Sequence, residues 1–143
     1  MIRLSIITVV YNDMDGLRKT IRSIDKVFGL HNENGFLEHV IIDGGSTDGT
    51  KEYLESLKNK ERAYDVKWIS ECDGGIYDAM NKGVNYSSGN FLVFVNADDE
   101  IYSNIDLISL RVELEKSFGN VASAGLAMSS IIHFSNRCFQ IKP

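Results

Sequence analysis

Short apolar runs alternate along the chain with segments whose apolar residues recur every three or four positions. The runs are typical of buried strands, and the spaced segments are typical of amphipathic helices. Strands are predicted at residues 4–10, 38–42, 66–70 and 91–95. Helices are predicted around Leu17, Ile21, Ile24 and Phe28, around Tyr53, Leu54 and Leu57, and after Asp73. Strand and helix in alternation, with short connections, predict an α/β fold with a mainly parallel sheet flanked by helices.

The run of residues 91–95 contains no polar side chain, which favours a strand covered on both faces. Two carboxylates, Asp98 and Asp99, follow it almost directly. Ligands of parallel sheets bind beyond the carboxyl ends of the strands. Adjacent carboxylates repel each other, so this pair predicts a cation between the acids and an anionic ligand. A solvated turn is the alternative interpretation.

Polar residues also follow two other predicted strands. Thr8, Tyr11 and Asn12 belong to the first, and Asp43 follows the second, ahead of the glycine-rich turn 44–49. Because parallel strands end at one edge of the sheet, these residues are expected to converge on one cleft. Glycines in the turn permit close approach of a ligand, although a simple capped turn is the alternative. The turn matches neither a dinucleotide fingerprint nor a phosphate-binding loop, which argues against an oxidoreductase and an NTPase.

Composition is that of one soluble domain: 143 residues, 43% hydrophobic and 24% charged. The net charge of −5 argues against nucleic acid as a partner. Residues 1–100 hold 17 acidic and 11 basic side chains, so the acidity lies where the motifs lie. An anionic ligand at this part of the chain would therefore need a divalent metal.

Cysteines and histidines give no sign of a metal centre. Cys72 and Cys138 lack ligand spacing and are expected to be free thiols in a reducing cytosol. His31, His39 and His133 are scattered and are expected to be structural or surface residues. The apolar N-terminus is too short to span a membrane and lacks a signal-peptide cleavage site, so a first strand is the better interpretation.

Four blocks of sequence together resemble a known family. They are Leu4-Ser-Ile-Ile-Thr-Val-Val-Tyr-Asn12, Val40-Ile-Ile-Asp-Gly-Gly-Ser-Thr-Asp-Gly-Thr50, Ser70-Glu-Cys-Asp-Gly-Gly-Ile-Tyr-Asp-Ala-Met-Asn-Lys-Gly83 and Phe94-Val-Asn-Ala-Asp-Asp99. In this order they resemble the nucleotide-sugar-binding half of the inverting GT-A glycosyltransferases of family 2. The third block is most similar to the branch that builds bacterial exopolysaccharides such as colanic acid. The resemblance implies a GT-A, Rossmann-like fold.

The resemblance implies a nucleoside diphosphate sugar, typically of UDP or GDP, as the donor. Thr8 and Tyr11 would wall the base, Asp43 would bond to the base or ribose, and Asp73 would border the nucleoside. A solvated helix residue is the alternative interpretation of Lys82. The implied donor-binding residues are Thr8, Tyr11, Asn12, Asp43, Asp73, Asn81, Lys82, Asn96, Ala97 and Asp98.

The family's metal motif is Asp-x-Asp, and here Asn96 stands at its first position. The resemblance therefore implies a divalent ion, Mn²⁺ or Mg²⁺, that rests mainly on Asp98 with Asp99 close by. Such an ion would neutralise the departing diphosphate, while a carboxylate base on the opposite face would deprotonate the acceptor hydroxyl. Inversion at the anomeric carbon follows from that geometry.

No catalytic base is identified. After Glu100 the acids that remain are Asp106, Glu113 and Glu115, which fall on a predicted amphipathic helix over 104–118 as surface charges. A further apolar strand or buried segment is predicted at 121–134, and the tail 136–143 matches no pattern. The chain is thus expected to be a single domain, 1–143, with a nucleotide-sugar-binding core at 1–100 and a truncated or divergent part at 101–143.

The resulting hypothesis is an inverting, metal-assisted glycosyltransferase for cell-surface polysaccharide, with a UDP-sugar as the favoured donor and a saccharide or lipid-linked acceptor. The alternative is a nucleotide-sugar-binding protein without efficient transfer. A nucleotidyltransferase is disfavoured because residues 11–15 lack the basic loop of that class. A cytoplasmic location is expected, with peripheral contact to the inner membrane face and self-association as further hypotheses.

Overall fold

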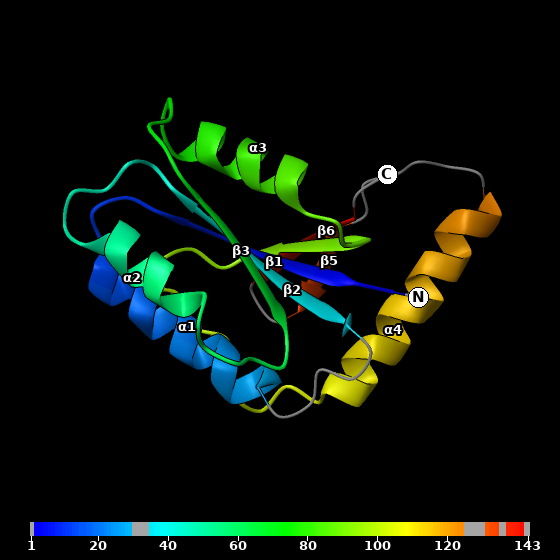
Figure 1. The fold of residues 1–143 in the computed structure, drawn as a ribbon. Coiled ribbons are helices and arrows are strands. Elements are labelled where there is room, and N and C mark those ends of the chain that lie inside the picture. The colour runs from blue at the N-terminus through cyan, green and yellow to red at the C-terminus, as the bar shows by residue number, and fades with distance from the viewer. Residues whose placement is uncertain (1, 30–34, 125–130, 135–136, 142–143) are drawn as a thin grey trace.

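A computed structural model gives the structure of residues 2–29, 35–124, 131–134 and 137–141, with the backbone alone described for 120–124 and the last two segments. Strands and helices alternate through most of it (Figure 1). In chain order the elements are β1 (Leu4–Val10), α1 (Met14–Phe28), β2 (Leu37–Asp43), α2 (Thr50–Leu57), β3 (Asp65–Ser70), α3 (Ile76–Tyr86), β4 (Phe91–Phe94), α4 (Leu107–Ala124), β5 (Ile131–Phe134) and β6 (Arg137–Ile141).

One sheet with the strand order β3-β2-β1-β4-β6-β5 forms the centre of the molecule. Strands β1 to β4 are parallel, and β6 is antiparallel to both β4 and β5. The register pairs Val10 with Asp43 and Asp43 with Ser70, so the carboxyl ends of β1, β2 and β3 are level. The predicted α/β fold with a mainly parallel sheet is confirmed.

Helices cover both faces of the parallel strands. Helices α1, α2 and α4 lie on one side of the sheet and α3 lies on the other (Figure 1). Apolar residues of α1 and α4, among them Ile24 and Leu110, pack with Leu4, Ile6 and Val93 of the sheet. This double coverage explains why the strands are uniformly apolar instead of alternating.

Helix α1 illustrates how the sequence sets an element. The side chain of Asp13 accepts a hydrogen bond from the Gly16 N–H at 3.0 Å and caps the first turn. Leu17, Ile21 and Ile24 then recur at helical spacing and are buried against the sheet. The helical face predicted from these positions is confirmed.

Helix α3 packs unusually close to the sheet. A Cβ atom on Gly83 would overlap Cγ2 of Ile7, so only glycine fits at this contact. The other buried position of the helix is Ala79, which joins Ile7, Val9 and Leu92 in the core on this side. Small residues thus bring α3, and the turn before it, against β1.

The amino edge of the sheet is held by a buried carboxylate. Glu38 is fully buried and accepts hydrogen bonds from Ser5 Oγ at 2.6 Å, Lys67 Nζ at 2.8 Å and Ser88 Oγ at 2.8 Å. Burial opposes ionisation, but the hydrogen bonds outweigh it and lower the pKa of Glu38 to about 2. The carboxylate therefore stays charged and ties β1, β2, β3 and the turn before β4 together.

The C-terminal part differs from its prediction in two places. Of the predicted strand or buried segment at 121–134, residues 121–124 continue helix α4 and residues 131–134 form strand β5. The tail, which matched no pattern, supplies β6 beside β4. Periodicity cannot separate a short apolar strand from a helix end, which explains the first difference. His31, for which a structural or surface position is predicted, lies outside the described residues.

Among the described residues, no helix combines the length and the apolar character that crossing a bilayer demands.

Candidate functional site

The turns after β1 and β2 are bound to each other at the carboxyl edge of the sheet. The backbone N–H of Asn12 donates to Ser46 Oγ at 2.7 Å, and Asn12 Oδ1 accepts from the Thr47 N–H at 2.8 Å. Asp48 Oδ2 accepts from the Met14 N–H at 2.9 Å. Asn12 has a φ of 49°, a left-handed conformation that asparagine tolerates better than most residues. Asn12 therefore links the two turns by hydrogen bonds of its backbone and its side chain.

Asp43 lies inside this edge and is fully buried. Its Oδ1 accepts from the Ser46 N–H at 3.1 Å and its Oδ2 accepts from Ser70 Oγ at 2.6 Å. The Ser46 hydroxyl also donates to Oδ1. A ligand hydroxyl reaches this carboxylate only by replacing one of the two serine hydroxyls.

The side chains of Tyr11 and Asp73 both lie close to the backbone of Gly44, which has no side chain of its own. A Cβ atom on Gly44 would lie 2.9 Å from Asp73 Oδ2 and 3.4 Å from Tyr11 Cδ2. The Tyr11 side chain is 67% exposed, and Asp73 accepts from the Gly75 N–H at 2.8 Å. An exposed ring and a carboxylate around a glycine form a surface that suits a flat base and its ribose.

Thr8 lies behind this surface. Its side chain is fully buried, and its hydroxyl donates to the Val95 carbonyl at 2.6 Å. The 2.8 Å bond between Thr8 Oγ1 and His39 Nε2 must then be donated by the imidazole. Burial lowers the pKa of His39 to about 3, which keeps the ring neutral. Thr8 and His39 together fix the end of β4 instead of facing a ligand.

The two predicted residues of α3 are placed differently. Lys82 Nζ lies 2.9 Å from Glu71 Oε1 and donates to the Cys72 carbonyl at 3.2 Å, so it folds onto the turn that holds Asp73. The hydrogen bond with Glu71 raises the pKa of Lys82. Asn81 is exposed on the same helix, and none of the contacts described for the edge involves it.

The turn after β4 is fastened to α1. The hydroxyl of Thr20 donates to the Asn96 carbonyl at 3.0 Å and to the Asp99 carbonyl at 2.7 Å. The Ala97 N–H donates to the Val9 carbonyl at 3.1 Å and continues the ladder of β1 and β4. Helix α1 thus holds the candidate metal motif beside the end of β1.

Three oxygen-bearing side chains follow in this turn. Asp98, with a φ of 70°, places Oδ1 2.9 Å from Lys19 Nζ, and its hydrogen bond raises the pKa of that lysine. Asp99 Oδ2 accepts from the Asn96 N–H at 3.2 Å. Asn96 Oδ1 is buried and has no hydrogen-bond partner among the residues that the structure describes. An orphaned amide oxygen next to carboxylates is a donor set that hard divalent cations accept.

The described residues do not form a cluster of charged metal ligands. No group of three or more His, Cys, Asp or Glu side chains that could hold an ion occurs in the described part of the chain. Asn96, Asp98 and Asp99 carry side-chain oxygens, the type of ligand that hard divalent cations prefer.

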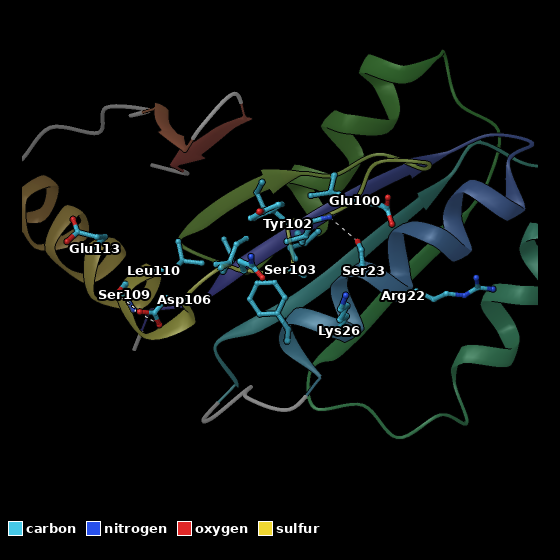
Figure 2. A pocket seen from close by; sticks show the side chains of 18 residues that line it. Arg22, Ser23, Lys26, Glu100, Tyr102, Ser103, Asp106, Ser109, Leu110 and Glu113 are labelled. Atoms are coloured by element: carbon cyan, nitrogen blue, oxygen red, sulfur yellow. Dashed lines mark hydrogen bonds between the residues drawn. The ribbon is translucent and has the colours of Figure 1, made fainter.

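A cavity with a volume of about 920 Å³ lies between α1, α4 and the segment 100–106 (Figure 2). Its lining includes Val95 and Glu100, which flank the 96–99 turn. Its walls are mostly apolar and include Leu4, Ile6 and Val93 of the sheet. Ser23 on α1 accepts from the Ile101 N–H at 3.0 Å at its border. Sequence patterns did not indicate this cavity, because it arises from the spacing of two helices over the sheet.

The sequence prediction also missed residues that shape the edge without belonging to a motif. Lys19 and Thr20 reach the 96–99 turn from α1, and Ser70 reaches Asp43 from β3. The one available signal was that Thr20 is polar yet falls close to the apolar face of α1. Its long-range carbonyl partners leave no local trace in the sequence.

Comparison with known proteins places this geometry in context. Residues 5–124 match the family model described as glycosyl transferase family 2. An uncharacterized glycosyltransferase of Mycobacterium tuberculosis is 37% identical over 129 residues, which cover 90% of this chain and 46% of the relative. The chain thus spans about half the length of that curated relative.

Solved structures show the same fold. The S. aureus protein TarS, residues 1–349, in complex with UDP-GlcNAc superposes with a TM-score of 0.59 at 21% identity, over 95% of this chain and 36% of that chain. The mannosyltransferase PcManGT from Pyrobaculum calidifontis, in complex with GDP-Man and Mn²⁺, gives a TM-score of 0.60 at 23% identity, over 67% of this chain and 27% of that chain.

Proposed function

The chain belongs to glycosyltransferase family 2, and from this premise we propose that it binds a nucleoside diphosphate sugar at the carboxyl edge of its sheet. The sugar would be transferred, with inversion, to a hydroxyl of a saccharide or lipid-linked acceptor. This reaction would belong to the synthesis of cell-surface polysaccharide. The observation on which the proposal depends is the joining of the turns after β1, β2, β3 and β4 into one surface. Asn12 joins the turns after β1 and β2, Asp43 at the end of β2 accepts from Ser70 at the end of β3, and Thr20 of α1 holds the turn after β4.

For the nucleoside we propose the surface between Tyr11 and Asp73. The exposed Tyr11 ring would pack against the base, and the Asp73 carboxylate would accept hydrogen bonds from the base or ribose. Gly44 leaves room because a side chain there would meet both residues. Asp43 would take part by exchanging a serine hydroxyl for a ligand hydroxyl. Uridine is the favoured nucleoside, and the UDP-GlcNAc held by the S. aureus relative of this fold supports that choice.

For the diphosphate we propose the 96–99 turn. Asn96 Oδ1, Asp98 and Asp99 would hold Mn²⁺ or Mg²⁺ together with phosphate oxygens, as the orphaned Asn96 oxygen favours. A bound divalent ion neutralises negative charge on the departing diphosphate. Lys19 would orient the Asp98 carboxylate through its 2.9 Å ion pair. Lys82 would stabilise the turn around Asp73.

None of the acids after Glu100 is assigned as the general base. Asp106 caps the start of α4 by accepting from the Ile108 N–H at 3.0 Å, while Glu113 and Glu115 pair with Lys116 and Arg111 along that helix. All three acids are exposed and bonded to neighbours on α4, so the proposal does not assign deprotonation of the acceptor hydroxyl to any of them. These roles also favour the second candidate, in which the chain by itself binds the donor without efficient transfer.

Thermal unfolding with nucleoside diphosphates separates these possibilities. A ligand of the folded state at 100 times its Kd stabilises the protein by about 2.7 kcal/mol, which raises the melting temperature by several degrees. We expect UDP with Mn²⁺ to give this increase and UDP with a chelator to give a much smaller one. Sugar release to water or to an acceptor then distinguishes transfer from binding alone. Equal melting temperatures with UDP, GDP and ADP, with or without Mn²⁺, would refute the proposal.

A further inference from the structure

A second pocket, strongly basic, lies between α1 and α2. It has a volume of about 410 Å³, and its lining contains four cationic side chains and one acid. The cations are Arg18, Arg22, Lys60 and Arg62, and the acid is Asp25. It shares no residue with the predicted donor and metal residues. The pocket is therefore a feature that the proposed function does not use.

Two of the arginines are held in place with unused donors. The Arg62 side chain is 11% exposed and binds Asp25 through Nε at 3.2 Å and Nη2 at 3.3 Å. Its Nη1 is buried and has no hydrogen-bond partner among the described residues. Arg18 stacks 4.9 Å from the centre of the Tyr53 ring, and its Nε is also buried without a partner. Buried guanidinium donors without acceptors are costly, and both arginines line the pocket.

The other two cations, Arg22 on α1 and Lys60 in the turn after α2, are exposed and border the pocket from opposite sides. Figure 2 shows the Arg22 side chain extending from α1 toward α2, away from the Lys26 side chain. Lys60 follows α2, and its backbone N–H donates to the Leu57 carbonyl at 3.1 Å. Both can adjust around a ligand while the two arginines stay fixed.

The charge balance of the pocket contrasts with that of the whole chain. The protein has a net charge of −5, yet one carboxylate faces four cations here, and that carboxylate is engaged by Arg62. Gathering like charges lowers stability unless a counterion is bound. Arginines bind planar or tetrahedral oxyanions through paired N–H groups, which suits a phosphate better than a simple halide.

We propose that this pocket binds a phosphate group of a ligand other than the sugar donor, either a soluble phosphate monoester or the headgroup of an anionic lipid. Arg18 and Arg62 would form the fixed part of the site, and Arg22 and Lys60 would close on the phosphate. The proposal does not depend on the proposed function, because the two sites have no residue in common.

The test is a calorimetric titration of the wild-type protein with glycerol 3-phosphate, compared with the double variant Arg22→Gln/Lys60→Gln. Arg22 and Lys60 are exposed, so the variant should fold as the wild type does. We expect it to bind the monoester at least about tenfold more weakly, since each lost charged contact contributes on the order of a factor of ten. Lys26→Gln is the matched control, an exposed cation one turn along α1, and should bind within about twofold of wild type.

Vesicle sedimentation separates the two sources of phosphate. Binding to vesicles with phosphatidylglycerol but not to phosphatidylcholine alone, lost in the double variant and kept in Lys26→Gln, would assign the site to a lipid headgroup. Monoester binding with no vesicle binding would assign it to a soluble ligand. Absence of both, or equal losses in the double variant and in Lys26→Gln, would overturn the proposal. Binding of UDP with Mn²⁺ should stay unchanged in the double variant, so failure at one site leaves the other testable.

Discussion

Single side chains at the carboxyl edge divide into those that build the turns and those that face solvent. Thr8 and Asp43 are fully buried and hold backbone or hydroxyl partners, whereas Tyr11 is largely exposed and Asp98 is 70% exposed at its side chain. If the proposed donor site is correct, Tyr11 and Asp98 are the more accessible to a ligand. The buried pair determines where the first contacts lie.

Replacement of Asp98 by asparagine tests the metal motif. We expect Asp98→Asn to weaken binding of UDP in the presence of Mn²⁺ by about tenfold or more, because one charged oxygen donor is lost. Isothermal titration with and without Mn²⁺ measures this. Glu100→Gln is the control, since Glu100 is exposed and lies 3.8 Å from the same Lys19. Equal UDP affinities in Asp98→Asn and wild type would contradict the assignment.

Replacement of Asn96 by aspartate tests the orphaned amide oxygen. A carboxylate at this part-buried position lacks a partner in the free protein, so Asn96→Asp should lower the free energy of unfolding by about 1 to 3 kcal/mol. Addition of Mn²⁺ should recover that loss and raise the melting temperature more than it does in wild type. If Mn²⁺ shifts both proteins equally, the side chain at position 96 does not face the ion.

At the residue scale, the sequence predicted which residues lie near the carboxyl ends of the strands. It did not predict the direction in which each side chain points. Tyr11, Gly44 and Asp73 do meet, as convergence of parallel strand ends requires. Thr8 instead points into the core, on the same face as Ile6 and Val10. Strand alternation could have indicated this face, but the Val95 carbonyl that satisfies the hydroxyl becomes evident only in the folded chain.

At the scale of the elements, the close packing of α3 on β1 depends on Gly83. Gly83→Ala should lower the free energy of unfolding by about 1 to 3 kcal/mol, because the added methyl overlaps Ile7 and forces the helix outward. Urea denaturation monitored by circular dichroism gives the value.

The matched control for that variant is Gly119→Ala in α4. Apart from its chain neighbours and the backbone of α4, no atom of the described residues lies within 4 Å of a Cβ at this position, so the substitution should be neutral or stabilising by up to about 1 kcal/mol through helix propensity. Equal effects of the two alanines would mean that propensity, and not the contact with Ile7, governs α3.

Element prediction was most accurate where periodicity is strong and local. The bounds of β1 were predicted to the residue, and α1 was recognised from one apolar face. The end of α4 and the whole of β6 were missed. Strand β6 exists through antiparallel pairing with β4, an interaction between segments about 45 residues apart that short-range patterns do not encode.

On the scale of the whole molecule, two buried groups predict destabilisation by acid. His39 has a folded pKa of about 3 against about 6.5 in the unfolded chain, and Glu38 has about 2 against 4.5. Both groups bind fewer protons when folded, so their contribution is complete above the unfolded values and falls as the pH drops. Stability should decline from pH 6.5 toward 3 through His39 and from pH 4.5 toward 2 through Glu38. Urea midpoints across this range measure both declines.

A variant separates the two contributions. Glu38→Gln removes the charge that Lys67 and Ser88 bind, so it should lower the free energy of unfolding at pH 7 by about 2 to 4 kcal/mol. It should also flatten the decline below pH 4.5 and leave the decline between 6.5 and 4.5 in place. An unchanged slope below pH 4.5 would show that Glu38 is not the group that titrates.

Helix α1 contacts every feature discussed above on its side of the sheet. Lys19 and Thr20 reach the 96–99 turn, Ser23 borders the cavity beside α4, and Arg18 and Arg22 enter the basic pocket. A single ¹⁹F label on this helix would therefore sense events at all three places. Its resonance offers one common readout by which nucleotide, divalent ion and phosphate ligands can be ranked in the same sample.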